Sequence, residues 1–306
     1  MKGAAVLVAG ALALAPLSAQ GDKSVRMQTL NVRDILYLLT GGSNTLALMR
    51  DEGVLLVDTK PAGWGRAILD NIESVTDQPV TTIINTHAHA DHVGGNLEFP
   101  SATTIVAHAN AKARMEKMSA FQGANAKALP NKVVTDRMAL LDGDDRIELY
   151  YFGRGHTDGD LVVVFPVKRV AHFGDLFPGK AAPFIDVENG GSAVAFVDTL
   201  AKAVAELTDV ARIVAGHDQG TTLMAGIEKR VGGSAIFANP RTMTRADLQE
   251  YADFNREFLE AVRQAMAAGK SADDAAKTLQ LPERYKAYDM TNAPANVRAI
   301  YRELGK

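Results

Sequence analysis

Short runs of β-branched and aliphatic residues, separated by clusters of turn-forming residues, fill the chain between residues 25 and 57. The separating clusters are the Gly- and Ser-containing stretch 40–44 and the acidic turn 51–53. Apolar runs bounded in this way are typical of β-strands. We therefore predict strands over residues 25–32, 35–39, 45–49 and 54–57.

The hydrophobic pattern changes after residue 60, where strand-like and helix-like segments alternate. Residues 64–72 and 110–118 have helical spacing, and Ser192 has the character of an N-cap before apolar residues that recur every three or four positions. Residues 123–132 are rich in loop formers. Further strands are expected over residues 80–84, 105–107, 138–141, 146–152, 161–165, 170–173 and 212–215. Strands followed by strands mixed with helices predict two sheets with helices outside them.

The last part of the chain has a helical pattern. Residues 244–247 have the sequence of a capping box and open a long amphipathic helix that ends near Gly269. A shorter helix is expected to start at Ser271. We therefore predict a main domain over residues 20–220 and a helical extension over residues 221–306 that packs on it. A separate binding module is the alternative for this extension.

The first residues have the pattern of a secretory signal peptide. Lys2 provides a positive charge, residues 3–15 are apolar, and residues 17–19 offer a small-residue cleavage site. The apolar stretch is shorter than the ~20 residues that span a bilayer, which disfavours the alternative of a membrane anchor. We predict that residues 1–19 are a signal peptide, that the protein is exported to a periplasmic or extracellular location, and that it does not bind a membrane after cleavage.

The composition is that of a globular protein, with 47% apolar and 23% charged residues among 306. The net charge of −3 and the lack of a long basic run disfavour nucleic acid as a partner, so we expect a small-molecule substrate. The chain has no cysteine, which excludes disulfides, thiolate metal sites and a cysteine nucleophile. The sequence gives no indication of oligomeric state.

Three of the seven histidines fall within six residues, in the motif His87-Ala88-His89-Ala90-Asp91-His92. The motif follows the predicted strand at residues 80–84. Alternate residues at a strand end point to one side, so His87 and His89 can bind one ion together, and Asp91 and His92 can face a second. Imidazole and carboxylate are the ligands that zinc accepts when no cysteine is present. The motif therefore predicts a metal site.

A His-x-His-x-Asp-His motif after an apolar strand resembles that of the metallo-β-lactamase superfamily. Three later stretches resemble the other motif positions of this family and occur in the same order; they are residues 155–160 (Gly-His-Thr-Asp-Gly-Asp), 172–175 (His-Phe-Gly-Asp) and 216–217 (Gly-His). The resemblance covers about residues 26–217. It implies a fold of the α/β class, a four-layer αββα sandwich with the metal site at one edge of the two sheets, here followed by a C-terminal helical extension.

The same resemblance implies two divalent metal ions per chain, with zinc expected and with iron or manganese as alternatives that suit the same ligands. One ion would take His87, His89 and His156, and the other Asp91, His92 and His217. Asp175 would bridge the two ions, together with a water or hydroxide. A shared water between two cations is readily deprotonated. Asp91 would orient the resulting hydroxide and carry its proton toward the leaving group, as the catalytic residue.

The expected reaction is therefore hydrolysis of an ester, lactone, thioester or amide. A bridging Asp175 resembles the dinuclear hydrolases of the glyoxalase II and lactonase type, whereas zinc β-lactamases typically carry Cys or Ser there. β-Lactam hydrolysis and a mononuclear iron sulfur-dioxygenase activity are the alternatives; a complete second ligand set argues against the dioxygenase.

Four further positions have two interpretations each. His108 is expected at a helix start or on the surface rather than on a metal, and His172 in the core or behind the metal ligands. Asp58 either braces the metal-binding loop, as a resembling family position does, or is an ordinary turn residue. Residues 184–192 either form a loop over the site or simply lead into the helix after Ser192.

Overall fold

The computed structural model describes residues 23–31, 35–100, 102, 104–217 and 242–305. The predicted signal peptide lies outside the described residues. The first sheet has seven strands in the order of the sequence, antiparallel from β1 to β4 and parallel from β4 to β7. These strands are β1 (Arg26–Asn31), β2 (Leu36–Thr40), β3 (Thr45–Leu48), β4 (Val54–Val57), β5 (Val80–Ile84), β6 (Thr104–His108) and β7 (Lys132–Val134).

The second sheet has five strands in the order β12-β11-β10-β9-β8. Its neighbours are antiparallel except for β11 and β12, which are parallel. The strands are β8 (Arg137–Leu140), β9 (Ile147–Tyr150), β10 (Val162–Phe165), β11 (Val170–His172) and β12 (Arg212–Val214). The strands expected from the hydrophobic pattern are thus present, with ends shifted by a few residues.

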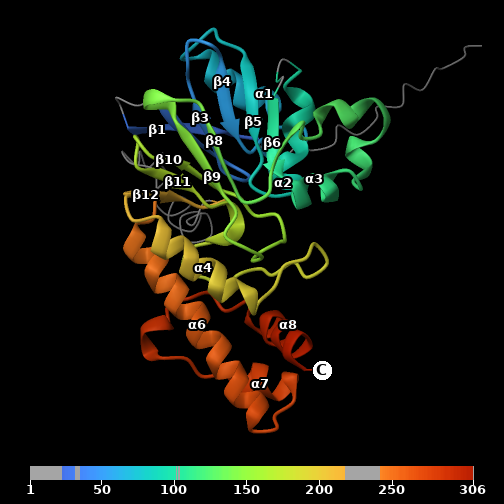
Figure 1. Cartoon of the computed structure of the whole chain (residues 1–306), viewed down its shortest axis with the longest axis vertical. Helices are drawn as coiled ribbons and strands as arrows, with labels where there is room; N and C mark the ends of the chain where they lie inside the picture. The colour runs from blue at the N-terminus through green and yellow to red at the C-terminus, as the bar shows by residue number, and fades with distance from the viewer. Residues whose placement is uncertain (1–22, 32–34, 101, 103, 218–241, 306) are drawn as a thin grey trace, which may run out of the picture.

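Four layers result from how these sheets bury their two faces. One apolar cluster lies between the sheets and joins residues such as Leu46 of β3 to Val163 of β10. A second packs α1 (Gly65–Glu73) and α3 (Ala109–Met115) on the outer face of the first sheet. A third packs α4 (Ala195–Glu206) and α6 (Arg245–Ala267) on the outer face of the second sheet (Figure 1). The arrangement is an αββα sandwich, as predicted.

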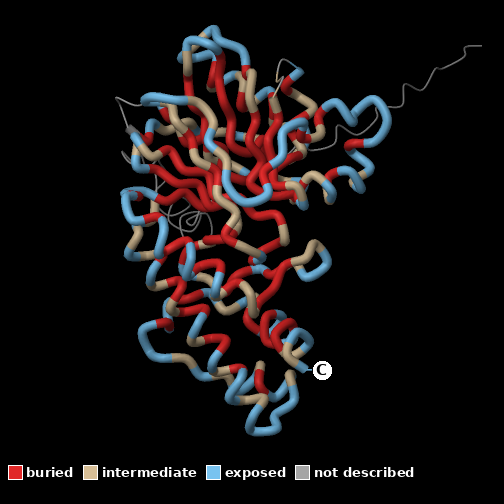
Figure 2. The backbone as a smooth tube through the Cα atoms, in the orientation of Figure 1, coloured by how far each residue is buried: buried red, intermediate tan, exposed pale blue. Residues whose placement is uncertain are grey.

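The C-terminal helices continue this third cluster. The capping box that opens α6 is present: Thr244 Oγ1 accepts from the amide of Asp247, whose carboxylate accepts from the amide of Thr244. Ser271 caps α7 (Ala272–Thr278), and α8 (Ala293–Leu304) follows. Tyr251 and Phe254 of α6 are fully buried in the same cluster as residues of β10 and β11. Buried backbone therefore runs from the sheets into the helical layer (Figure 2).

Short helices fill several connections. They are α2 (Ala90–Val93) and the 3-10 helices Gly94–Glu98, Ser119–Phe121, Gly123–Ala128, Gly143–Asp145, Gly174–Leu176 and Glu283–Tyr285. The predicted loop at 123–132 contains one of them and the first residue of β7. Within the described ranges, no helix has the length and apolar character needed to cross a membrane.

Candidate metal centre

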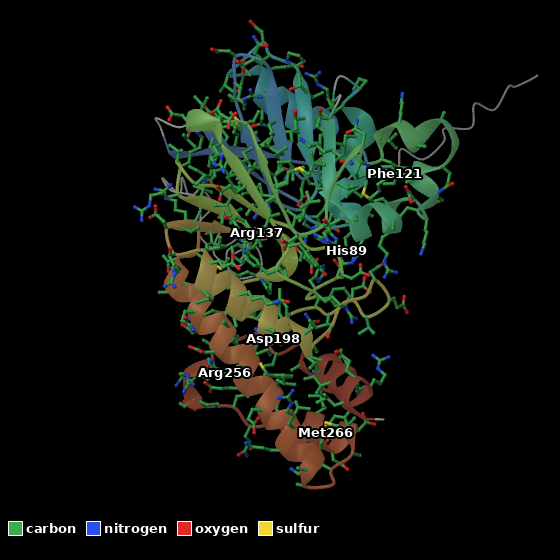
Figure 3. All side chains as sticks on the ribbon, viewed as in Figure 1. His89, Phe121, Arg137, Asp198, Arg256 and Met266 are labelled. Carbon is green, nitrogen blue, oxygen red and sulfur yellow. The ribbon has the colours of Figure 1, made fainter. Side chains whose placement is uncertain are left out.

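Seven side chains meet where strands of both sheets end. The motif at residues 87–92 follows β5, Asp175 follows β11, His217 follows β12, and His156 lies in the connection between β9 and β10. In Figure 3 the labelled His89 lies at the ends of the strands nearest the C-terminal helices. The parallel pairing of β11 with β12 directs the residues after both strands to the same edge. Segments far apart in sequence therefore contribute to one cluster.

The cluster divides into two groups. In each group, one ligand atom per residue lies within 4.8 Å of the others, so that a single ion could contact them all. We call the first the buried group and the second the rim group. The buried group is His87, His89, His156 and Asp175, and the rim group is Asp91, His92 and His217. The structure brings together all seven residues that the sequence analysis named.

Asp175 lies between the two groups. Its Oδ1 is 3.4 Å from His92 Nε2, and its Oδ2 is 3.7 Å from His156 Nε2 and 3.5 Å from His217 Nε2. One carboxylate thus faces imidazoles of both groups. Burial raises the pKa of the Asp175 carboxyl, but the surrounding imidazoles, His92 foremost, outweigh this and hold the pKa well below its usual range.

Two imidazoles of the buried group are fixed by hydrogen bonds on the side away from the cluster. The Nδ1 of His156 is 2.7 Å from the carbonyl oxygen of Phe184, to which it donates. The Nε2 of His89 is 2.7 Å from Asp186 Oδ2 and donates to it. His156 Nε2 and His89 Nδ1 are the nitrogens left to face the cluster, and they lie 2.9 Å apart. Each could donate a lone pair to one cation placed between them.

Asp58 and Thr86 fix two more imidazoles. His92 Nδ1 is 2.7 Å from Asp58 Oδ2, which also accepts a hydrogen bond from Thr86 Oγ1 at 2.7 Å. The oxygen of that hydroxyl lies 3.0 Å from His87 Nδ1 and accepts a hydrogen bond from it. The ligand nitrogens left over, Nε2 of His87 and of His92, therefore face the cluster. Of the two interpretations of Asp58, the structure supports the brace.

The protonation of the other groups follows from their surroundings. Burial, with the neighbouring His92, lowers the pKa of His87 well below its ordinary value, so this imidazole is neutral. His217 behaves in the opposite way: although burial lowers its pKa, hydrogen bonds to Asp175 and Asp91 raise it to about 10. Burial also works against ionisation of Asp91, but His217 and His92 lower its pKa. At neutral pH Asp91 and Asp175 are thus anionic, and His217 carries a proton that a cation could displace.

A glycine makes room for the bridging carboxylate. A Cβ at Gly216 would overlap Asp175 Oδ1 and lie 3.0 Å from His92 Cε1. The glycine before His217 in the motif is therefore required for space.

The cluster fits a pair of divalent cations. His87 Nε2 and Asp175 Oδ1 are buried without a hydrogen-bond partner in the described part of the chain, although buried polar atoms are nearly always paired. His92 Nε2 and His217 Nε2 lie 3.3 Å apart, in the rim group. Neutral imidazoles and carboxylates are the donors that zinc accepts in proteins without cysteine ligands.

Comparison with known proteins agrees with this geometry. Residues 39–217 match the family model of the metallo-beta-lactamase superfamily. The chain belongs to the metallo-β-lactamase superfamily. At this level it is a metal-dependent hydrolase with His and Asp groups able to bind metal.

Individual members of the superfamily resemble the chain at low identity. It is 28% identical over 236 residues to a type 2 metallo-β-lactamase of Elizabethkingia meningoseptica, a match that covers 71% of this chain and 88% of that enzyme. A metallo-β-lactamase from Pontibacter korlensis has a similar fold, with a TM-score of 0.59 at 16% identity over 76% of this chain and 99% of that one. An inverting sec-alkylsulfatase from a Pseudomonas species reaches a TM-score of 0.69 at 14% identity, covering 90% of this chain and 50% of that one.

The two remaining histidines of this superfamily member lie outside the cluster, as predicted. His108 caps α3, where its Nδ1 accepts from the amide of Asn110 at 3.2 Å. It is buried against Tyr151 rather than on the surface. His172 is fully buried, and its Nδ1 accepts from the amide of Gly174 at 3.0 Å. Burial lowers the pKa of His172 to about 4, so it stays neutral in the core.

Residues 184–192 lie against the cluster, which supports the first of their two interpretations, a loop at the site, although no single residue of it was given a role. Asp186 holds His89 at 2.7 Å, and the carbonyl of Phe184 holds His156. The one signal in the sequence is an acidic residue in a Gly-containing loop after Asp175, and nothing in the spacing connects it to His89. The helix after this loop begins at Ala195, slightly later than expected, although Ser192 Oγ still accepts from the Ala195 amide at 3.0 Å.

Lys60 was also missed. It is fully buried in the interior beside the cluster, where its Nζ donates to the carbonyl oxygens of Leu39, at 2.8 Å, and of Ser43. Ser43 in turn donates to the carbonyl oxygen of Asp91 at 2.5 Å. Lys60 thus holds the β2–β3 turn that supports the rim group. A lone lysine after a strand carries no sequence signal for such a role.

Proposed function

We propose that this protein is a dinuclear zinc hydrolase that cleaves a small-molecule ester, lactone, thioester or amide. The observation that carries the proposal is the pair of imidazole contacts at 2.9 and 3.3 Å, with Asp175 lying between them. The ligand atoms of each group converge closely enough for one cation to contact them all. His87, His89 and His156 would hold one ion, Asp91, His92 and His217 the other, and Asp175 both.

Two cations held by these residues would supply Lewis-acid activation of a water and of a carbonyl oxygen. The protein's own contribution is orientation. Asp58, Thr86, Asp186 and the carbonyl of Phe184 hold the imidazole rings so that the ligand nitrogens need not reorganise during reaction.

Asp91 is the proposed proton carrier. Its side chain is 41% exposed, and its Oδ2 lies 3.1 Å from His217 Nε2 and 3.6 Å from His92 Nε2. Because its pKa is lowered, the carboxylate is ionised at neutral pH and can accept a proton from the attacking water. Its exposure leaves it free to pass that proton to a leaving group.

A cavity beside the rim group has room for a small molecule. Its volume is about 460 Å³, and its walls include His217, Asn44, Phe177 and Tyr288. Sites of this size are typical of small-molecule substrates. We also propose that residues 1–19 direct the protein to a periplasmic or extracellular location, where such a substrate would be met.

β-Lactam hydrolysis is the second candidate. It is favoured by the 28% identity to the Elizabethkingia meningoseptica enzyme, which spans 88% of that relative. The carboxylate of Asp175 between the two groups distinguishes this chain from zinc β-lactamases, which typically carry Cys or Ser there. We therefore rank it below ester, lactone and thioester hydrolysis.

The test is a panel of lactone, thioester, aryl ester, β-lactam and phosphodiester substrates with the zinc-loaded chain. The control is the same preparation after chelation and then after reloading with zinc. We expect turnover of a carboxylic ester, lactone or thioester that is lost on chelation and restored by zinc. Turnover of β-lactams alone would favour the second candidate, and oxygen consumption by an iron-loaded form without hydrolysis would refute both.

A further inference from the structure

Phe184 is an exposed aromatic residue beside the buried group. Its relative exposure is 54%, and it is the one aromatic among the large hydrophobic side chains that are exposed in the described part of the chain. Its ring centroid lies 5.6 Å from that of His156 and 6.2 Å from that of His89. The ring therefore flanks two imidazoles that face the cluster.

The exposure of Phe184 does not come from a loose backbone. Its carbonyl oxygen accepts from His156 Nδ1 at 2.7 Å, and the next residue, Ile185, is buried in the cluster of α4 and α6. The amide of Asp186 donates to the carbonyl of His156 at 2.9 Å. The backbone on both sides is thus held, and the ring is presented to solvent from a fixed position.

A second anchor holds the far side of the loop. Arg114 of α3 forms an ion pair with Asp158 at 2.7 Å and donates to the carbonyl of Glu188 at 3.2 Å. Val187, next to that residue, is 40% exposed. The loop therefore carries two exposed apolar side chains, Phe184 and Val187, between firm attachments.

The apolar surface of Phe184 lies where a substrate bound at the ligand cluster would meet it. Phe184 belongs to none of the three apolar clusters of the described residues, so it contributes little to the core. The exposed members of the ligand cluster, Asp91 and His217, are polar. A substrate bound at the cluster would thus meet polar groups at the rim and an apolar wall beside His89 and His156.

We infer that Phe184 determines specificity by contacting an apolar acyl or alkyl group next to the scissile bond. The substrate would be an ester, lactone, thioester or amide that carries such a chain. This inference rests on the proposed function. Its competitor is that the ring only shields the imidazoles of His89 and His156 from water.

The test measures kcat/KM for a series of straight-chain aryl esters, from acetyl to octanoyl, with the zinc-loaded full-length chain. Each methylene that reaches the wall should raise kcat/KM by about threefold, the gain expected from partial burial of a CH₂ group. Phe184→Gln should flatten this dependence of kcat/KM on chain length. Phe184→Leu, which keeps an apolar side chain, should retain most of the slope.

Val167→Gln provides the matched control. Val167 has the same 54% exposure and lies in the turn between β10 and β11, away from the edge where β11 ends at the cluster. It should leave the slope unchanged. Equal slopes in the wild type and Phe184→Gln would overturn the inference while leaving the hydrolase intact. A uniform loss across all chain lengths, together with loss of zinc, would also overturn it and favour the shielding role.

A binding measurement separates this inference from the proposed function. Alkyl hydroxamates of increasing chain length, which chelate zinc, are titrated calorimetrically into the zinc-loaded wild type and Phe184→Gln. We expect Kd to fall about threefold per methylene in the wild type and to be nearly independent of chain length in the variant. This result without hydrolysis of any ester would support the apolar wall and refute the hydrolase. Chain-length dependence that is the same in both proteins would refute the wall.

Discussion

The two ligand groups differ in burial and in how they are held. In the buried group, the side chains of His156 and Asp175 are 1% and 19% exposed, and each imidazole has its own hydrogen-bond partner outside the cluster. In the rim group only His92 is buried, whereas the side chains of Asp91 and His217 are 41% and 44% exposed. On the proposed function, the buried group would retain its ion, and the more exposed rim group would meet the substrate.

The largest effect is expected from replacing Asp175, the residue that the buried group and the rim group share. Asp175→Ala should abolish binding of both ions and lower kcat/KM by about a thousandfold or more, because its carboxylate faces imidazoles of each group. Metal content and turnover are measured together. Asp142→Ala is the control, since this fully exposed carboxylate lies in the β8–β9 connection, at the other end of β9 from His156. Retention of both ions in Asp175→Ala would show that the groups are independent.

Asp91→Asn separates metal binding from catalysis in the rim group. The amide keeps an oxygen ligand but cannot accept the proton, so turnover should fall by about a hundredfold to a thousandfold while most of the metal remains. The pH–rate profile of the wild type should lose its acidic limb in the variant. Undiminished activity would contradict the role of Asp91.

Asp186→Asn tests the direct bracing of the buried group. The Asp186 carboxylate fixes the tautomer and orientation of His89. Burial raises the pKa of this carboxyl, but hydrogen bonds from Asn189 and His89 outweigh burial and lower it. Replacing such a partner typically weakens metal affinity by about tenfold to a hundredfold. Competition with a zinc chelator should show that the variant has lost affinity for the ion of the buried group only. Equal weakening of both ions would mean that the two groups are not held separately.

Lys60 tests the indirect bracing of the rim group, with the smallest expected effect. Burial lowers its pKa from 10.5 to about 7, against the attraction of Asp58. Between about pH 7 and 10 the unfolded chain binds the extra proton, so the contribution of Lys60 to the free energy of unfolding rises with pH in this window. Below about pH 7 both states bind it, and the contribution stays constant.

Lys60→Met removes this dependence. Urea unfolding of the metal-free proteins at several pH values should show the stability of the wild type rising relative to the variant above about pH 7. A difference between the two proteins that does not change with pH would mean that the lysine is charged throughout.

The sequence predicts the parts of this protein that are local along the chain. The strands at residues 80–84 and 170–173 come from short runs rich in β-branched and apolar residues, and the capping box at 244–247 marks the start of α6. The ligands at residues 87–92 follow from alternation at a strand end. The other ligands were named through resemblance to a family, because no local rule connects His156 or His217 to that motif.

The remainder depends on contacts that the sequence does not encode locally. Asp186 meets His89 across 97 positions. Ser192 Oγ donates to Glu303 of α8, and Lys60 donates to backbone carbonyls around the β2–β3 turn. The sequence analysis assigns no helix to α8, whose first turn contains a proline, a residue that breaks a helix interior but is tolerated at its first positions. The exposed ring of Phe184 can be related to the ligand cluster only in the structure, which places its loop beside His89 and His156.

The most direct test of the account is elemental analysis of the purified full-length chain after equilibration with zinc and removal of free metal. The account predicts about two zinc ions per chain in the wild type, and about one, held by the buried group, in His217→Ala. A wild-type ratio of one or none would contradict it, because the second pair of facing imidazoles would then have no cation between them.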